Sequence, residues 1–381
     1  MNFEFSYPIY YILLLIISIF LSKFLFIRYL GFAKKYNLTK STNSRTAHKG
    51  IVYTGAGLVY AAVIMVTALV LDDLDFVEFS NFSPVIATSI LISIVGFYDD
   101  FRDISPFHKY ITLSFLILML LYSNATIPVI QNLNGFLGFY NIGFIPGLIF
   151  TSFVFLSIIN SINLIDGIDG YLSIFSIFIF IGFTIINDIN EFYTLSSVSI
   201  VLTGSCITFL RYNFSRQNKL FIGDAGSIFL GFWISTFLVT YITSSSYSSI
   251  VDTFSIRLEN IPVIAISLIS IPVLDTMRVM FVRIMNKKSP FSPDRNHLHH
   301  ILIDSGMSHL RTSFILTFIN FLNCILIFLV EQNFNSKELT LIFIGICVFW
   351  YVFFELLKRK NVNSWLVKES VFFYPDCFYL S

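Results

Sequence analysis

The sequence predicts an all-α, polytopic membrane protein with about eleven transmembrane helices. Of the 381 residues, 56% are hydrophobic and only 12% carry a charged side chain, and the mean hydropathy is +0.78. A soluble domain of this size needs more polar residues to cover its surface, so this composition is typical of a protein that crosses a membrane many times. The apolar residues also form stretches near the length of roughly 20 residues that a spanning helix needs.

Eleven apolar stretches divide the chain, and they lie near residues 8–29, 51–71, 82–98, 107–124, 143–162, 170–187, 193–211, 221–243, 261–284, 312–330 and 339–357. The N-terminus, MNFEF, lacks the basic segment and the cleavage site of a signal peptide, so we expect the first stretch to remain as a membrane helix. Residues 125–142 contain the turn-rich segment VIQNLNGFLGFY and are expected to form a short external hairpin.

The distribution of charge predicts the orientation of the helices. The loop after the first stretch carries five basic residues between positions 34 and 49, whereas the next loop carries only acidic ones between 72 and 78. Because basic residues favour cytoplasmic loops, we expect an external N-terminus and a cytoplasmic C-terminus. Residues 1–357 are expected to form one integral membrane domain, and residues 358–381 a cytoplasmic tail of unknown role.

Three carboxylates end the third stretch, in the segment GFYDDFRDIS. Asp99, Asp100 and Asp103 lie within five residues, so they repel one another unless positive charge compensates. Arg102 and Lys109 can compensate in part. A divalent cation can do so better, because Mg²⁺ prefers carboxylate and phosphate oxygens as ligands. The alternative is a solvated helix end.

Amides and carboxylates follow one another in the segment N-S-I-N-L-I-D-G-I-D-G, which joins the fifth and sixth stretches. Asn160 and Asn163 are one helical turn apart, and Asp166 and Asp169 repeat that spacing. A helix that continued through the segment would place these polar groups on one face, where they suit hydroxyl groups and base edges. The alternative is a polar helix end followed by a turn.

A glycine-flanked acid precedes the eighth stretch, in the segment F-I-G-D-A-G-S. Asp224 lies between Gly223 and Gly226, and Ser227 is expected to cap a helix. The N-terminus of a helix favours anionic ligands, and Asp224 beside it could hold a metal ion that phosphates share. Taken alone the motif is weakly specific, because many helices begin in this way.

Two basic segments lie on the predicted cytoplasmic side. In S-P-D-R-N-H-L-H-H, the side chains suited to donate hydrogen bonds to phosphate oxygens are Arg295, His297, His299 and His300. A zinc site is one alternative, but no cysteine or H-E-x-x-H accompanies these histidines, and a structural loop is another. In the second segment, residues 43–50, we predict that His48 and Lys49 contribute to binding, although cytoplasmic loops are commonly basic.

These motifs, in this order, resemble those of the polyprenyl-phosphate N-acetylhexosamine-1-phosphate transferases, a glycosyltransferase family 4 type of membrane enzyme. The resemblance covers roughly residues 1–357. It rests on D-D-x-x-D at Asp99, N-x-x-N-x-x-D-G-x-D-G at Asn160 and F-x-G-D-x-G-S at Phe221. The PDRNHLHH segment is similar to the branch that uses UDP-GlcNAc. Ala56, in Y-T-G-A-G-L, departs from the Gly-Gly form of this loop in relatives.

The resemblance implies a catalytic domain in the bacterial inner membrane, with its active site on the cytoplasmic face. Such an enzyme transfers N-acetylhexosamine 1-phosphate, with GlcNAc 1-phosphate expected, from a UDP-sugar to undecaprenyl phosphate. It releases UMP and starts the synthesis of a lipid-linked cell-envelope polysaccharide. No nucleic-acid partner is expected, and a homodimer is possible.

The resemblance also implies roles for the motif residues. Phe221 and the segment from Asn160 to Asp169 hold the uridine, and Gly223 contributes to substrate binding. Asp224 holds Mg²⁺, or Mn²⁺ in its place, which acts as a Lewis acid on the diphosphate. Asp99 or Asp100 takes the proton of the lipid phosphate or acts as a covalent nucleophile, and Asp103 completes the catalytic group.

A proton-coupled transporter or a flippase for lipid-linked sugars is the alternative class. Such proteins carry acids near the middle of the membrane and between repeats, whereas these acids lie at helix ends. The four cysteines are scattered without a C-x-x-C pair, which argues against a disulfide framework or a cysteine metal site. The sequence leaves the sugar and the downstream polysaccharide open.

Overall fold

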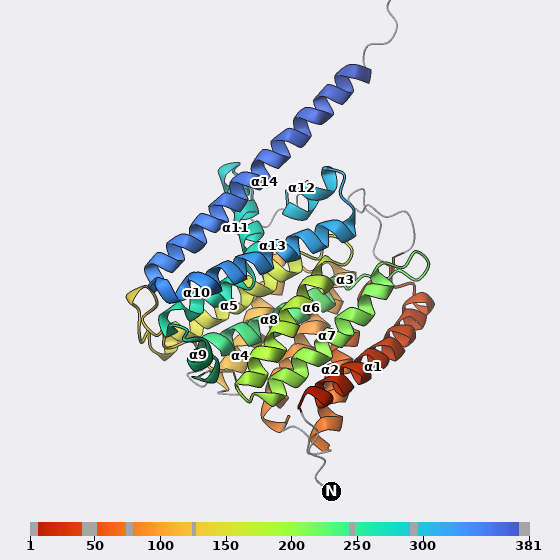
Figure 1. Cartoon of the computed structure of the whole chain (residues 1–381). Helices are drawn as coiled ribbons and strands as arrows, with labels where there is room; N and C mark the ends of the chain where they lie inside the picture. Colours follow the sequence, from red (N-terminus) through yellow and green to blue (C-terminus); the bar gives the residue numbers. More distant parts are fainter. Residues whose placement is uncertain are drawn as a thin grey trace, which may run out of the picture.

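The computed structural model describes most of the chain as a bundle of helices (Figure 1). The described residues are 7–39, 52–73, 79–123, 127–243, 248–289 and 296–372, with side chains omitted at 7, 248–250 and 360–372. Within these residues the β-structure is limited to isolated bridges, so the prediction of an all-α fold is confirmed.

Twelve of the described helices overlap the predicted apolar stretches. They are α1 (Tyr7–Lys35), α2 (Leu58–Asp73), α3 (Ser83–Arg102), α4 (Pro106–Tyr122), α5 (Phe144–Leu164), α6 (Tyr171–Ile189), α7 (Tyr193–Asn213), α8 (Gly223–Thr243), α10 (Ile261–Ser267), α11 (Ser270–Met285), α13 (His309–Val330) and α14 (Ser336–Phe372). Two short helices, α9 (Ser248–Phe254) and α12 (Leu298–Asp304), lie between them.

The described part of the chain contains eight helices that are long and apolar enough to cross a membrane. A ninth span results if α10 and α11, which meet at an angle of 71°, are counted together. The helices α2 and α4 have 16 and 17 residues, which is short for a bilayer that needs about 20. The protein is therefore a multi-pass membrane protein, while the number eleven remains a prediction.

The break between α10 and α11 is stabilised by one buried amide of α13. Asn320 accepts hydrogen bonds from the backbone N–H of Ile271 at 3.0 Å and from the Ser270 hydroxyl at 3.1 Å. Its Nδ2 donates to the carbonyl of Leu268 at 2.6 Å. Irregular backbone at membrane depth needs such partners, because lipid supplies none. The break consequently divides the predicted stretch 261–284 into two helices.

Helix α8 lies at the centre of the bundle. In its most apolar window 94% of the residues are buried, against 11% in α14. It packs against α3 and α5 at positions that only glycine permits. A Cβ atom on Gly96 of α3 would lie 2.4 Å from the Asp224 carbonyl oxygen, and one on Gly231 of α8 would lie 2.9 Å from Ile159 Cα. This close packing brings the start of α8 against the ends of α3 and α5.

Residues 127–142 form the predicted hairpin. Leu133 N–H donates to the Tyr140 carbonyl at 2.9 Å, and Ile142 N–H donates to the Gln131 carbonyl at 2.8 Å. Its external position remains a prediction. At the other end of the chain, α14 continues across the predicted domain boundary at residues 357 and 358 and projects beyond the other helices (Figure 1).

The predicted orientation can be tested by labelling single cysteines from outside intact cells. Asp73 and Arg216 are both exposed, and we expect them on opposite sides of the membrane. In a background without native cysteines, Asp73→Cys should react with a membrane-impermeant maleimide, whereas Arg216→Cys should react only after permeabilisation. The reverse pattern would show that the N-terminus is cytoplasmic.

Candidate functional site

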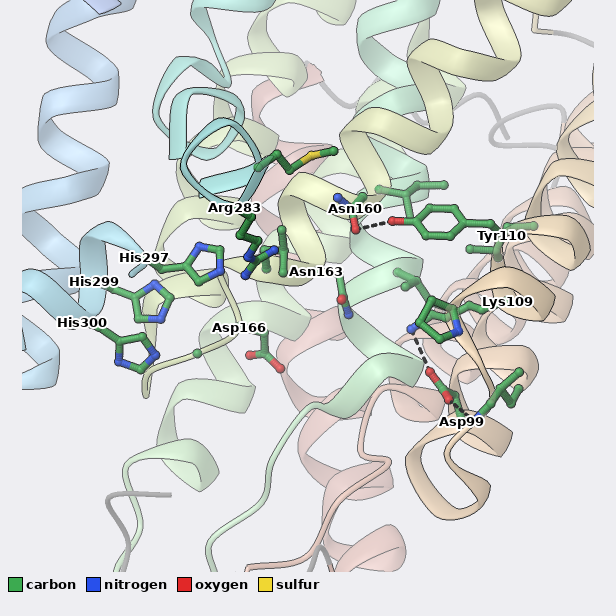
Figure 2. Close-up of a pocket in the computed structure, with 18 residues that line it drawn as sticks. Asp99, Lys109, Tyr110, Asn160, Asn163, Asp166, Arg283, His297, His299 and His300 are labelled. Atoms are coloured by element: carbon green, nitrogen blue, oxygen red, sulfur yellow. Dashed lines mark hydrogen bonds and ion pairs between the residues drawn. The ribbon is translucent and has the colours of Figure 1, made fainter. Parts of the chain in front are cut away.

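The predicted motifs meet around a cavity of about 390 Å³ (Figure 2). Helices α3, α5 and α11 end at this cavity, and α4 and α8 begin there. The predicted site residues that line it are Asp99, Asn160, Asn163, Asp166, His297, His299 and His300. Figure 2 shows the three histidines on one side of the cavity and Asp99 with Lys109 on the opposite side.

A lysine of α4 joins the first and third acidic motifs. Lys109 Nζ lies 2.8 Å from Asp99 Oδ2 and also forms an ion pair with Asp224 Oδ2. The side chains of Lys109 and Asp99 are only 14% and 11% exposed, so solvent screens this pair weakly. The second oxygen of Asp99 accepts a hydrogen bond from Ile104 N–H at 2.7 Å, which fixes the carboxylate at the end of α3.

The amides of α5 complete this cluster. Asn163 Nδ2 donates to Asp224 Oδ1 at 3.0 Å and to the Ser227 hydroxyl at 2.7 Å. One turn earlier, Asn160 Oδ1 accepts a hydrogen bond from the Tyr110 hydroxyl at 2.5 Å. Because Asn160 and Asn163 lie one turn apart on a helix, both reach the cavity, as their spacing predicted.

The helix does not continue through the rest of this motif. Helix α5 ends at Leu164, so Asp166 lies in the following turn, where it still lines the cavity. Asp169 is not among the lining residues; its Oδ2 forms a buried ion pair with Lys219 at 2.6 Å and lies 3.4 Å from His309 Nδ1. The expectation of one continuous polar face was wrong, because the chain turns before Asp169.

Asp100 faces α8 and does not line the cavity. Its carboxylate oxygens accept hydrogen bonds from the N–H groups of Asp224 at 2.9 Å and Ala225 at 3.2 Å. Asp100 thus caps α8 from a neighbouring helix, and Ser227, expected to be the cap, lies inside α8. Gly223 adopts a φ of +69°, and a Cβ atom there would lie 2.2 Å from Asp100 Oδ2. Both features bring the acid of α3 against the start of α8.

The third acid of this motif lies apart from the cavity. Helix α3 extends to Arg102, one turn beyond the expected end at Tyr98, and Asp103 follows with a left-handed backbone at φ 46°. Its side chain is exposed. Lys109, expected to compensate the whole acidic cluster in part, pairs with Asp99 and Asp224 instead.

These positions predict unequal effects of substituting the three acids. We expect Asp99→Asn and Asp100→Asn each to lower kcat at least tenfold, because one loses its charge in the cavity and the other weakens the cap that positions Asp224. Asp103→Asn should keep kcat within about twofold, as surface substitutions usually do. The kcat of each purified variant is measured by steady-state kinetics and compared with that of the wild type. A loss at Asp103 equal to that at Asp99 would contradict the assignment.

Phe221 and Gly223 lie beside the loop that carries Ala56, and neither is among the lining residues of the cavity. Phe221 N–H donates to the Tyr53 carbonyl at 2.7 Å, and its own carbonyl accepts from Ala56 N–H at 3.4 Å. Ala56 is fully buried and has no positive φ, so the backbone at this position does not require glycine.

The histidines of the HLHH segment differ in their surroundings. His299 is 1% exposed, and neither ring nitrogen has a hydrogen-bond partner among the described residues. Burial lowers the pKa of His299 well below its usual range, and the nearby His300 adds to the shift. His299 is therefore neutral at pH 7, and it packs against Gly167, where a Cβ atom would lie 2.2 Å from its Nε2.

Three predicted binding residues lie outside the described part of the chain. They are His48, Lys49 and Arg295. Three lining residues with polar side chains were not among the predicted site residues, namely Lys109, Tyr110 and Arg283. Arg283 is 6% exposed and lies in the apolar stretch 261–284. A charged residue in such an apolar stretch is rare and usually functional. The charge of Arg283 is therefore the sequence signal that could have identified it as a site residue.

The residues at the start of α8 fit a magnesium ion bound together with phosphates. The ammonium group of Lys109 lies between the carboxylates of Asp224 and Asp99. The two acids therefore already stabilise one positive charge at this position. Asn163 Nδ2 donates to Asp224 Oδ1 and so orients this carboxylate. The described residues contain no group of three or more His, Cys, Asp or Glu side chains able to hold a metal. Mg²⁺ needs no such group, because it usually takes one or two carboxylates and completes its shell with phosphates and water.

Comparison with known proteins adds independent information. Residues 82–242, from the start of α3 to the end of α8, match the family model of glycosyl transferase family 4. The chain is 38% identical to a decaprenyl-phosphate N-acetylglucosaminephosphotransferase of Mycolicibacterium smegmatis over 123 residues. The matched region covers 32% of this chain and 29% of that protein. The chain is 33% identical over 165 residues to a probable undecaprenyl-phosphate N-acetylglucosaminyl 1-phosphate transferase of Bacillus subtilis, covering 43% and 42%.

A third relative matches over a longer region. The undecaprenyl-phosphate alpha-N-acetylglucosaminyl 1-phosphate transferase of Pasteurella multocida is 28% identical over 363 residues, which is 93% of this chain and 96% of that protein. In the two matches of higher identity, by contrast, the chain spans less than half the length of the relative.

Proposed function

Because this chain carries a glycosyl transferase family 4 region, we propose that it transfers N-acetylhexosamine 1-phosphate, specifically GlcNAc 1-phosphate, from a UDP-sugar to undecaprenyl phosphate. UMP is released, and the lipid-linked sugar starts the synthesis of a cell-envelope polysaccharide. The names of the relatives, each a transferase acting on a polyprenyl phosphate, support this assignment. The proposal places the protein in a bacterial inner membrane, with the cavity facing the cytoplasm.

One observation carries the proposal: acids, amides and bases from five helices meet in a single cavity at the ends of those helices. Asp99 and Asn163 lie near the ends of α3 and α5, and Lys109 lies near the start of α4. Such a position allows a water-soluble nucleotide sugar and the headgroup of a membrane lipid to reach the same atoms. A transporter would instead need its polar site near the middle of the membrane.

The cavity divides into two sides with different chemistry. On one side, Arg283 and His300 supply donors for the oxygens of a diphosphate. On the other, Lys109 supplies a positive charge next to Asp99 and Asp224. Asn160 and Asp166 lie between them with the hydrogen-bonding groups that a nucleoside or sugar needs. We assign Asp169 and Phe221 to the packing around this site, because the carboxylate of Asp169 pairs with Lys219 and the backbone of Phe221 bonds to the loop that carries Tyr53.

Asp224, whose carboxylate is oriented by Asn163, is the residue that would hold Mg²⁺, which would supply Lewis-acid polarisation of the diphosphate when bound. The protein holds these two side chains with the Asn163 hydrogen bonds and the Asp100 cap, so their geometry is fixed before substrate arrives.

The transfer is a direct displacement. An oxygen of the lipid phosphate attacks the β-phosphorus of the donor, a new P–O bond forms, and the bond to UMP breaks with its electron pair on the UMP oxygen. Asp99 is the acid placed to accept a proton from the lipid phosphate, since it lines the cavity and Asp100 faces α8. A phosphate monoester is mostly dianionic at neutral pH, so alignment by Lys109 contributes more than proton removal.

The proposal is tested by the release of UMP from radiolabelled UDP-GlcNAc by the purified protein in detergent. We expect release only when both UDP-GlcNAc and undecaprenyl phosphate are present. A panel of UDP-GlcNAc, UDP-GalNAc and UDP-glucose identifies the sugar. A cooperative thermal unfolding transition shows that the purified protein is folded. If such protein releases no UMP with any of these donors, the proposed transferase function is rejected.

A further inference from the structure

A buried carboxylate on α11 holds the first residues of α12. Asp275 lies in an apolar span and is 5% exposed. One of its oxygens lies 3.0 Å from His297 Nδ1, and both accept from Leu298 N–H, at 3.1 and 3.2 Å. Asp275 thus caps α12 and fixes the imidazole that precedes it. A buried acid inside a membrane helix is expensive, so its retention needs a specific role.

A second charged residue of α11 completes this anchor. Arg278 donates to Asp275 Oδ1 at 3.1 Å and also to the carbonyl of Asn296. From α14, Lys358 Nζ donates to Asn296 Oδ1 at 2.8 Å. Asn296, His297 and Leu298 are therefore each bound by a charged side chain from another helix. The guanidinium of Arg278 compensates the buried carboxylate, so Asp275 is ionised and can only accept hydrogen bonds.

This arrangement decides which atom of His297 can meet a ligand. Because the partner of Nδ1 is an acceptor, Nδ1 carries a proton, and Nε2 is the ring nitrogen left for the cavity that His297 lines. A carboxylate that holds one ring nitrogen sets the orientation and protonation of the other. Neither the sequence motifs nor the resemblance assigns any role to Asp275.

We infer that Asp275 is a positioning residue for the donor substrate: it holds His297 with Nδ1–H directed to α11, so that Nε2 is an acceptor for a hydroxyl or amide N–H group of the donor sugar. The inference rests on the proposed function for the identity of the ligand. The orientation of His297 does not depend on it and can be measured without turnover.

The first measurement is ¹⁵N NMR of the wild-type protein labelled at histidine, with His297→Gln used to assign the signal. We expect Nδ1 of His297 to be protonated. In Asp275→Asn the amide can keep accepting from Leu298 N–H but turns an N–H group toward the ring, so the proton of the neutral ring should move to Nε2. An unprotonated Nδ1 in the wild type would overturn the inference, whether or not the variant folds.

The second measurement is the dissociation constant for UDP-GlcNAc, determined by isothermal titration calorimetry. Asp275→Asn and His297→Ala should each weaken binding about tenfold, the effect of one well-placed hydrogen bond. The double variant should bind no more weakly than His297→Ala, because Asp275 acts through His297. Additive losses would show that Asp275 is merely structural and would overturn the inference.

Two controls separate positioning from general damage. In His297→Asn, Nδ2 can replace Nδ1 as the donor to Asp275, so we expect wild-type thermal stability together with the tenfold loss of affinity. Asp188→Asn makes the same chemical change at the far end of α6, where the carboxylate accepts from Tyr11 at 2.7 Å; its affinity should be unchanged. Wild-type protein that shows the predicted His297 signal without UMP release would reject the proposed function and leave the positioning role intact.

Discussion

Substitution of Asp224 by asparagine is expected to lower kcat about a thousandfold, which corresponds to about 4 kcal/mol of transition-state stabilisation. The change preserves size and leaves an oxygen that can still accept from Asn163 Nδ2, so the start of α8 should keep its structure. What is removed is the negative charge that a hard divalent cation requires, and a metal acting as Lewis acid supplies several kcal/mol.

The measurement is kcat as a function of Mg²⁺ concentration for the wild type and Asp224→Asn, each corrected for the folded fraction. The wild type should lose activity in excess chelator and regain it with Mg²⁺ or Mn²⁺. Asp188→Asn, far from the cavity, serves as the matched control and should retain wild-type turnover. Full activity of Asp224→Asn, or of the wild type in chelator, would refute the assignment of a metal to this residue.

Substitution of Lys109 by methionine should lower kcat at least a hundredfold. Methionine preserves the length of the side chain but removes the ammonium group that lies between Asp99 and Asp224. The two carboxylates then face each other without a compensating charge, and the phosphates lose a cationic neighbour. Removing one partner of a buried ion pair also destabilises a fold by about 3–5 kcal/mol, so turnover must be expressed per folded molecule.

A matched control is available because Lys219 forms a similar pair outside the cavity. The side chains of Lys219 and Lys109 are both 14% exposed, and Lys219 lies 2.6 Å from Asp169. Lys219→Met should therefore reduce thermal stability as Lys109→Met does, but keep kcat of the folded protein within about threefold. Equal losses of kcat in the two variants would mean that Lys109 acts only through stability.

The sequence by itself determined the class of fold and the positions of most helices. Hydropathy is a sum over neighbouring residues, and a membrane requires the backbone of an apolar stretch to be hydrogen-bonded internally, so a helix follows directly. Local spacing was sufficient for Asn160 and Asn163 as well, because residues one turn apart on a helix share a face whatever surrounds them. The same reasoning failed at Asp169, where the chain turns after Leu164.

Only the tertiary structure decided which acid faces the cavity and which supports a neighbouring helix. Asp99 and Asp100 are adjacent in sequence, yet successive residues on a helix point about 100° apart. The rotation of α3 is set by its contact with α8, which Gly96 and Gly223 permit by lacking a Cβ atom. That contact directs Asp100 to the N–H groups of α8 and leaves Asp99 to Lys109. Asp100 and Asp224 are 124 positions apart, and no local pattern in the sequence can specify such a pairing.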